Sequence, residues 1–278
     1  MIKGENNVLK LNSAIDSVSG MNIKSMDWTC PSIERERTGM QGRDYLILPA
    51  RQNLEARVYS SRIQEMGIKS DSSSYCLKEL SQIGDMDYDL LSDPMIREVI
   101  HLIEHHNDRP MLLEVEAPFT VLAALMNPID LYLRLEDKGE EALLIRILHQ
   151  IADASAEYIR ACLEAGCRII SLADPAGTMD LVGEKCYRNI CGETEIYLMK
   201  RCRSYLKRAV IHICRKMSLS LMLADLVQVY PYHSGGSMGS HMDILAEMAD
   251  DPEILYTGMT CIHNEKPDLQ SSYIVEVK

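Results

Sequence analysis

Phe and Trp are scarce in this sequence, with one of each among 278 residues, whereas Met occurs 17 times. The flexible thioether side chains of Met would therefore fill part of the core that aromatic rings fill in other proteins. A compositional bias without functional meaning explains the same counts. Hydrophobic residues still make up 46% of the chain. This is ample for a large core and argues against intrinsic disorder.

Positive charge is also in short supply. The chain has 29 Lys and Arg against 41 Asp and Glu, a formal net charge of −12. Such a balance argues against nucleic acid or an anionic membrane surface as a partner. No stretch approaches the roughly 18 to 20 continuous apolar residues of a membrane span, and the N-terminal residues do not read as a signal peptide. We therefore expect no membrane association.

Several catalytic motifs are missing. The sequence has no Gly-rich phosphate loop, no Gly-x-Ser-x-Gly and no Cys-x-x-Cys, which excludes nucleotide-hydrolase, serine-hydrolase and zinc-ribbon readings. Its nine cysteines are odd in number and scattered along the chain. This distribution favours free thiols in a reducing compartment, so we expect a cytoplasmic protein.

Apolar strand-like runs alternate with segments of helical periodicity, which predicts βα units and a parallel sheet. The expected strands are 44–49, 56–60, 111–118, 168–175, 208–214, 225–231 and 253–261. The length suits one α/β domain of the (β/α)8 TIM barrel class over residues 1–278, with 1–43 as a polar N-terminal extension. A closed barrel needs eight strands, so we expect one βα unit to be lacking or unrecognised near the C-terminus.

A His-x-Cys pair, His212 and Cys214, closes one of the expected strands, and Cys261 ends another. Residues i and i+2 of a strand face the same side, so the imidazole and the thiol are offered together. One His and two Cys form a donor set that binds zinc and leaves a fourth position open. The competing interpretation is that these are ordinary core side chains, because buried Cys behaves as a small hydrophobe.

Two acidic residues are candidate catalytic groups. Asp174 follows a strand, where Pro175 and Gly177 shape a turn that would aim its carboxylate into a barrel mouth. A helix N-cap explains Asp174 equally well. Glu116 alternates with Glu114 in an otherwise apolar strand, where buried carboxylates are costly unless they are partnered. We expect Glu116 to lie in the mouth, with a surface ion pair as the alternative.

Four stretches together resemble the uroporphyrinogen decarboxylase-like superfamily, and within it the methylcobamide:coenzyme M methyltransferase branch. They are Pro110–Thr120, Glu164–Gly177, Ile211–Cys214 and Thr257–Cys261, and the similarity extends over about residues 44–261. The Ala-Asp-Pro-Ala-Gly and His-Ile-Cys segments are the distinctive ones. Members of this superfamily are (β/α)8 barrels.

The resemblance implies zinc bound by His212, Cys214 and Cys261, and a place in the substrate cavity for Asp174. It implies transfer of a methyl group between a corrinoid (cobalamin) held by a partner protein and a small thiol or similar acceptor. A free thiol has a pKa of about 8.5, whereas a metal-bound thiol is deprotonated. Two alternatives remain open: a lyase acting on a tetrapyrrole without metal, and a non-catalytic corrinoid-binding barrel.

Overall fold

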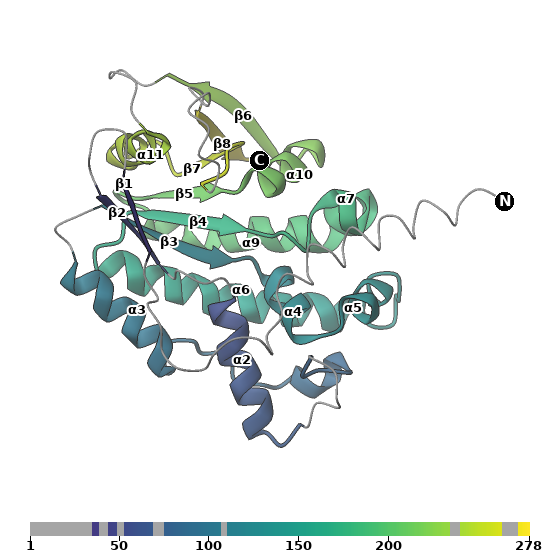
Figure 1. The fold of residues 1–278 in the computed structure, drawn as a ribbon. Helices are drawn as coiled ribbons and strands as arrows, with labels where there is room; N and C mark the ends of the chain where they lie inside the picture. The colour runs from purple at the N-terminus through teal and green to yellow at the C-terminus, as the bar shows by residue number, and fades with distance from the viewer. Residues whose placement is uncertain are drawn as a thin grey trace.

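The computed structural model describes residues 35–38, 44–48, 53–68, 75–106, 110–233, 240–262 and 272–278. Within these ranges the strands form one eight-stranded sheet in the order β1-β2-β3-β4-β5-β7-β8-β6. Figure 1 shows this sheet with α3, α6 and α9 along one side and α11 on the other. The expected alternation of strands and helices is confirmed.

The element bounds are as follows. The strands are β1 (Arg35–Thr38), β2 (Asp44–Leu48), β3 (Met111–Glu116), β4 (Ile169–Ala173), β5 (Val210–Ile213), β6 (Val227–Tyr232), β7 (Tyr256–Gly258) and β8 (Ser272–Val277). The helices are α2 (Leu54–Glu65), α3 (Pro94–His105), α4 (Pro118–Leu125), α5 (Pro128–Arg134), α6 (Glu141–Glu164), α7 (Met179–Val182), α8 (Glu184–Cys186), α9 (Gly192–Cys202), α10 (Arg215–Leu223) and α11 (His241–Asp250). Shorter helical turns are η2 (Leu80–Ile83), η3 (Tyr187–Cys191) and η4 (Arg203–Tyr205).

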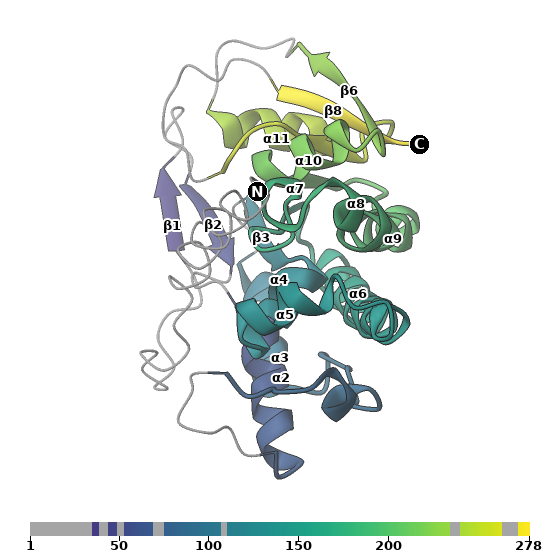
Figure 2. The ribbon, with the colours of Figure 1, turned by 90° about the vertical axis from the view of Figure 1, so that its right-hand side faces the viewer.

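The sheet contains a run of parallel strands like that of a barrel, but it stays open. Strands β2, β3, β4, β5 and β7 run parallel in succession. Beyond β7 the direction reverses, because β8 pairs antiparallel with β7 and then with β6. Figure 2 shows β1 and β2 at one end of the sheet and β6 and β8 at the other. The described strands therefore do not close, and the expected shortage of a βα unit falls near the C-terminus.

The strand expected at 225–231 forms as β6, but at a different place from the one that a barrel would give it. It lies on the far edge of the sheet instead of between β5 and β7. Its partner is β8, a strand that the sequence pattern did not predict. As a consequence β5 and β7 are direct neighbours, with Ile211 opposite Tyr256 and His212 opposite Thr257.

The two faces of the sheet differ in what covers them. On one face Leu113, Ile170 and Ile211 join the large apolar core that extends into the long helices. On the other face Leu112 and Ile169 pack with α11 in a second, smaller core at the amino-terminal ends of the strands. Alternate residues of a strand share a face. The polar residues that lie two positions after Leu112 and Ile169, toward the carboxyl ends of these strands, therefore also point to the α11 side.

The strand expected at 56–60 is wrong, because this segment lies inside α2. Leu54, Val58, Tyr59 and Ile63 are all buried there, a spacing that belongs to one side of a helix. Five residues are too few to separate this period from strand alternation. Strand β1 falls within the expected N-terminal extension, of which residues 1–34 lie outside the described residues. None of the described helices has both the length and the apolar character needed to cross a bilayer.

Candidate functional site

A cavity of about 130 Å3 lies at the carboxyl ends of β3, β4 and β5. This is the end of a parallel sheet at which α/β proteins gather their ligand-binding groups. The lining residues are Asn53, Glu55, Glu114, Val115, Glu116, Ser171, Ala173, Asp174, Pro175, Cys214, Lys216, Met217, Cys261 and Ile262. Four of the five residues proposed from the sequence, all except His212, therefore line one cavity.

The two predicted ligand cysteines lie side by side because β5 and β7 are neighbours in the sheet. The Cys214 thiol is hydrogen-bonded to the Cys261 thiol. The turn that carries Cys261 is held against α10 by Ser218, whose hydroxyl accepts the Met259 N–H at 2.8 Å. Met259 has the left-handed φ of 63°, which turns the chain back toward β5.

The Cys214 thiol is neutral in the absence of a bound cation. The hydrogen bond that Cys214 donates to Cys261, and then burial, raise the pKa of Cys214 well above its usual range. Cys214 is also the N-cap residue of α10, and the backbone N–H groups of Arg215 and Lys216 act in the opposite direction. Ionisation of Cys214 therefore requires a positive partner, which a soft divalent cation beside the sulfur atoms would supply.

The side chain of His212 is completely buried. Its Nδ1 lies 3.3 Å from the Ser171 hydroxyl and its Nε2 lies 3.0 Å from the Thr260 hydroxyl. The Thr260 oxygen is in turn 2.9 Å from Nε2 of His241, whose pKa burial lowers to about 4. Among the described residues, the ligand atoms of His212 and the two cysteines do not all come within 4.8 Å of one another.

The cavity lining also includes four carboxyl groups. Burial raises the pKa of Glu55 to about 7, against the effect of two backbone N–H groups. Burial, and then the charge of Glu55, raises the pKa of Glu116 as well. Asn53 orients Glu116, with its amide nitrogen 2.6 Å from each carboxyl oxygen when the amide is turned to donate. The expected position of Glu116 in the mouth agrees with this arrangement.

Asp174 is buried in a set of hydrogen bonds that the sequence only partly indicated. The Thr120 hydroxyl donates to its Oδ1, and the Gly177 N–H donates to the same oxygen at 3.0 Å. Asp174 also shares a side-chain hydrogen bond with Glu195 of α9. Two carboxyl groups can bond in this way only when one of them carries a proton.

Glu195 is the member of this pair that carries the proton. Burial and then the charge of Asp174 raise the pKa of Glu195 well above its usual range. Its other oxygen accepts the Tyr187 hydroxyl at 2.6 Å. Burial raises the pKa of Asp174 as well, but its hydrogen bonds with Thr120, Glu195 and Gly177 oppose this rise, so Asp174 is the member of the pair that ionises first. The cavity is therefore bordered by a carboxyl group that rests on a buried, protonated one.

Comparison with known proteins now identifies the family. Residues 70–255, more than half of the chain, match the family model for uroporphyrinogen decarboxylase (URO-D). The chain belongs to the URO-D family. The similarity stated from the four sequence stretches is confirmed at the level of the family.

Individual relatives of this URO-D family chain match it over shorter lengths. The uroporphyrinogen decarboxylases of two Thermus thermophilus strains are each 32% identical over 85 residues, which is 29% of this chain. The chain spans 25% of the length of these curated relatives. A solved methyltransferase from Methanosarcina mazei aligns with a TM-score of 0.46 and 20% identity, over 61% of this chain and 50% of its own.

Glu195 and Glu55 were not singled out from the sequence. A signal for Glu195 was nonetheless present, because Cys191, Glu195, Leu198 and Cys202 follow one another at helical spacing and are all buried. A carboxyl group within an apolar stripe predicts a buried partner. Glu55 has no such signal, because the sequence pattern directly after it, at 56–60, predicts a strand.

Gly177 leaves the space that the Asp174 carboxyl group occupies. A Cβ at this position would lie 2.3 Å from Oδ2 and 2.7 Å from Cγ of Asp174. We expect Gly177→Ala to displace this carboxyl group from Thr120 and to lower the free energy of unfolding by about 1 to 3 kcal/mol. Urea denaturation measures this loss. Gly139→Ala is the control, because its Cβ would meet only Asp137 Oδ1, at 3.2 Å, on an exposed loop; an equal loss in both variants would contradict the expectation.

Proposed function

We propose that this chain is a methyltransferase that moves a methyl group between a corrinoid carried by a partner protein and a small thiol or similar acceptor. The observation that carries the proposal is the pair of neighbouring thiols, Cys214 and Cys261, on the wall of a cavity at the carboxyl ends of the strands. The two sulfur atoms suit zinc, a cation that thiolates bind well. When bound, zinc would keep an acceptor thiol in its reactive deprotonated form.

The transfer balances without a further reactant. The carbon–cobalt bond of the methyl-corrinoid breaks, and its electron pair stays on cobalt. The acceptor sulfur forms the new bond to the methyl carbon, and the thiol proton must leave to a base. Asp174 suits this role, because its neighbour Glu195 holds the proton of the buried pair and leaves Asp174 as the member that ionises first. Glu116, with its raised pKa, would serve as a neutral hydrogen-bonding group.

The role of His212 depends on the hydrogen bonds of its ring. Both of its ring nitrogens are engaged, one by Ser171 and one by Thr260. A ligand role for His212 would require the ring to leave one of these hydrogen bonds. Without that change, His212 would be a positioning residue that supports the turn carrying Cys261 through Thr260. Zinc content separates the two roles: a ligand role predicts loss of zinc from His212→Gln, whereas a positioning role predicts that zinc is retained.

The lyase alternative is disfavoured by charge. A decarboxylase must bind a substrate carboxylate, which calls for positive side chains in the cavity. Among the described lining residues only Lys216 is a cation, and it is exposed near the mouth. The same lining contains four carboxyl groups, those of Glu55, Glu114, Glu116 and Asp174. Such a wall favours a cation or a neutral substrate over a polycarboxylate.

We expect both Cys214→Ser and Cys261→Ser to lose a bound zinc at pH 8 and to lose methyl transfer. The loss of rate should exceed the roughly 10- to 100-fold that follows removal of an outer-shell partner. Elemental analysis of protein supplied with excess zinc measures the metal. Anaerobic reaction of methylcobalamin with a small thiol, followed by the absorbance of the corrinoid, measures the transfer.

Cys186→Ser is the matched control, because Cys186 is a partly buried thiol outside the cavity lining that bonds to the Leu135 carbonyl. It should retain wild-type zinc and wild-type rate. Equal zinc content in wild type and in the Cys214→Ser and Cys261→Ser variants would end the zinc proposal. Methylcobalamin that binds but never loses its methyl group to any thiol would instead support the non-catalytic corrinoid-binding alternative.

A further inference from the structure

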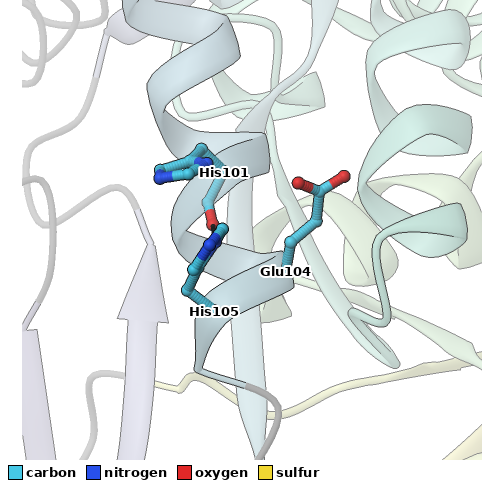
Figure 3. A group of neighbouring side chains, drawn as sticks. All are labelled: His101, Glu104 and His105. Atoms are coloured by element: carbon cyan, nitrogen blue, oxygen red, sulfur yellow. Dashed lines mark hydrogen bonds between the residues drawn. The ribbon is translucent and has the colours of Figure 1, made fainter.

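A second group of potential metal ligands lies outside the cavity, on the exposed side of α3. The ligand atoms of His101, Glu104 and His105 all lie within 4.8 Å of one another, and all three side chains are exposed. Within the described part of the chain this is the one group of three such residues at that distance. Figure 3 shows the three side chains projecting from the same helix, with the two imidazole rings next to each other.

Helical spacing places these side chains together. Residues four apart lie one turn above each other, and residues three apart are also neighbours. The ring centroids of His101 and His105 are accordingly 3.9 Å apart. Glu104 adds a carboxylate oxygen beside them. Two imidazole nitrogens and one carboxylate form a donor set that zinc accepts.

One hydrogen bond already prepares His105 for this role. Its Nδ1 lies 2.8 Å from the backbone carbonyl of His101. A carbonyl oxygen only accepts, so Nδ1 carries the hydrogen and Nε2 keeps its lone pair. Metal-binding histidines typically make this kind of bond with the nitrogen that does not face the metal, which fixes the tautomer and the ring orientation.

The electrostatics of the location also favour a cation. His105 is the last residue of α3, where the carbonyl groups at the end of the helix concentrate partial negative charge. Glu104 adds a full negative charge, and the chain as a whole has a net charge of −12. A divalent cation here would therefore offset negative charge without the desolvation cost of a buried site.

We propose that His101, Glu104 and His105 form a surface zinc site, whose remaining coordination positions are open to water. Its ligands are two imidazoles and a carboxylate, in contrast to the thiols of the cavity. The site is independent of the proposed methyl transfer. The zinc content of the wild-type protein would therefore be the sum of the zinc bound at two sites. The contribution of each site is the difference in zinc content between the wild type and the variants of that site.

The test uses the full chain with Cys214→Ser and Cys261→Ser in place, titrated with zinc at pH 7.5 by calorimetry. The expected result is one zinc per chain, lost when His101→Ala and His105→Ala are added. Glu104→Gln should weaken binding without abolishing it. His149→Ala is the matched control, since His149 is a helix histidine paired with Glu193, and it should bind as its parent does.

Cobalt(II) added to the chain with both cavity thiols intact gives a second readout that does not depend on cysteine variants. A site with nitrogen and oxygen ligands lacks the strong near-ultraviolet sulfur-to-cobalt absorption that a thiolate site produces. The double variant of His101 and His105 should lose only the cobalt that is held by nitrogen and oxygen ligands. The sulfur-to-cobalt absorption should remain. If zinc titrations are unchanged by the double histidine variant, the three residues are an exposed polar face and the surface site is wrong. If only the sulfur-dependent absorption is missing, the cavity proposal fails and the surface site stands.

Discussion

Replacing Glu195 by Leu is expected to lower the free energy of unfolding by about 3 to 5 kcal/mol, whereas replacing it by Gln should change it by less than about 1 kcal/mol. Leu removes the proton donor to Asp174 and the acceptor of the Tyr187 hydroxyl, and both partners are buried. Gln supplies an N–H to Asp174 and a carbonyl to Tyr187. It therefore reproduces the protonated form of Glu195.

Urea denaturation at pH 7 measures the difference between the two variants. Glu193→Leu is the control, because Glu193 lies on the same helix but is exposed, and its loss should cost little. The comparison also tests the charge state of the pair. If both carboxyl groups were ionised, Gln would remove a repulsion and stabilise the protein markedly. If Gln were as damaging as Leu, Glu195 would not act as a donor to Asp174.

Parallel βα units could be predicted because each strand and each long helix has its own local pattern. The open end of the sheet could not be predicted, because it depends on which strand pairs with which. The segment around Val229 reads as a strand wherever it lies, and only its pairing with Val275 places it on the edge. Strand β8 follows a segment with little pattern of its own. Pairing partners far apart in sequence leave no local signal.

The residues of the site also differ in how well the sequence predicts them. Cys214, Cys261, Glu116 and Asp174 were found because polar residues at the ends of strands converge at one edge of a parallel sheet. His212 shares a face with Cys214, as its strand position requires. The direction of its ring, however, depends on Ser171 and Thr260, whose hydroxyl groups reach it from other segments. Side-chain orientation in a crowded interior is decided by such partners.

Glu55→Gln is expected to stabilise the protein by about 3 kcal/mol at pH 8 and by less than about 1 kcal/mol near pH 5. The pKa of Glu55 is raised by burial from 4.5 to about 7, so between these values the native state holds a proton that the unfolded chain has released. Stability therefore falls as the pH rises above 4.5, and the loss is complete above about 7. Gln cannot ionise, so its variant avoids this loss.

Urea denaturation of both proteins from pH 5 to pH 8 isolates the contribution of Glu55, because other groups titrate in both. Glu65→Gln, at the exposed end of the same helix, is the control variant. A constant difference between Glu55→Gln and wild type would mean that Glu55 does not change its protonation in this range. A difference that grows with pH would show that an uncharged cavity wall is the stable form, since the charge of Glu55 also raises the pKa of Glu116. A bound cation would reverse this preference, because it stabilises the ionised carboxylates beside it.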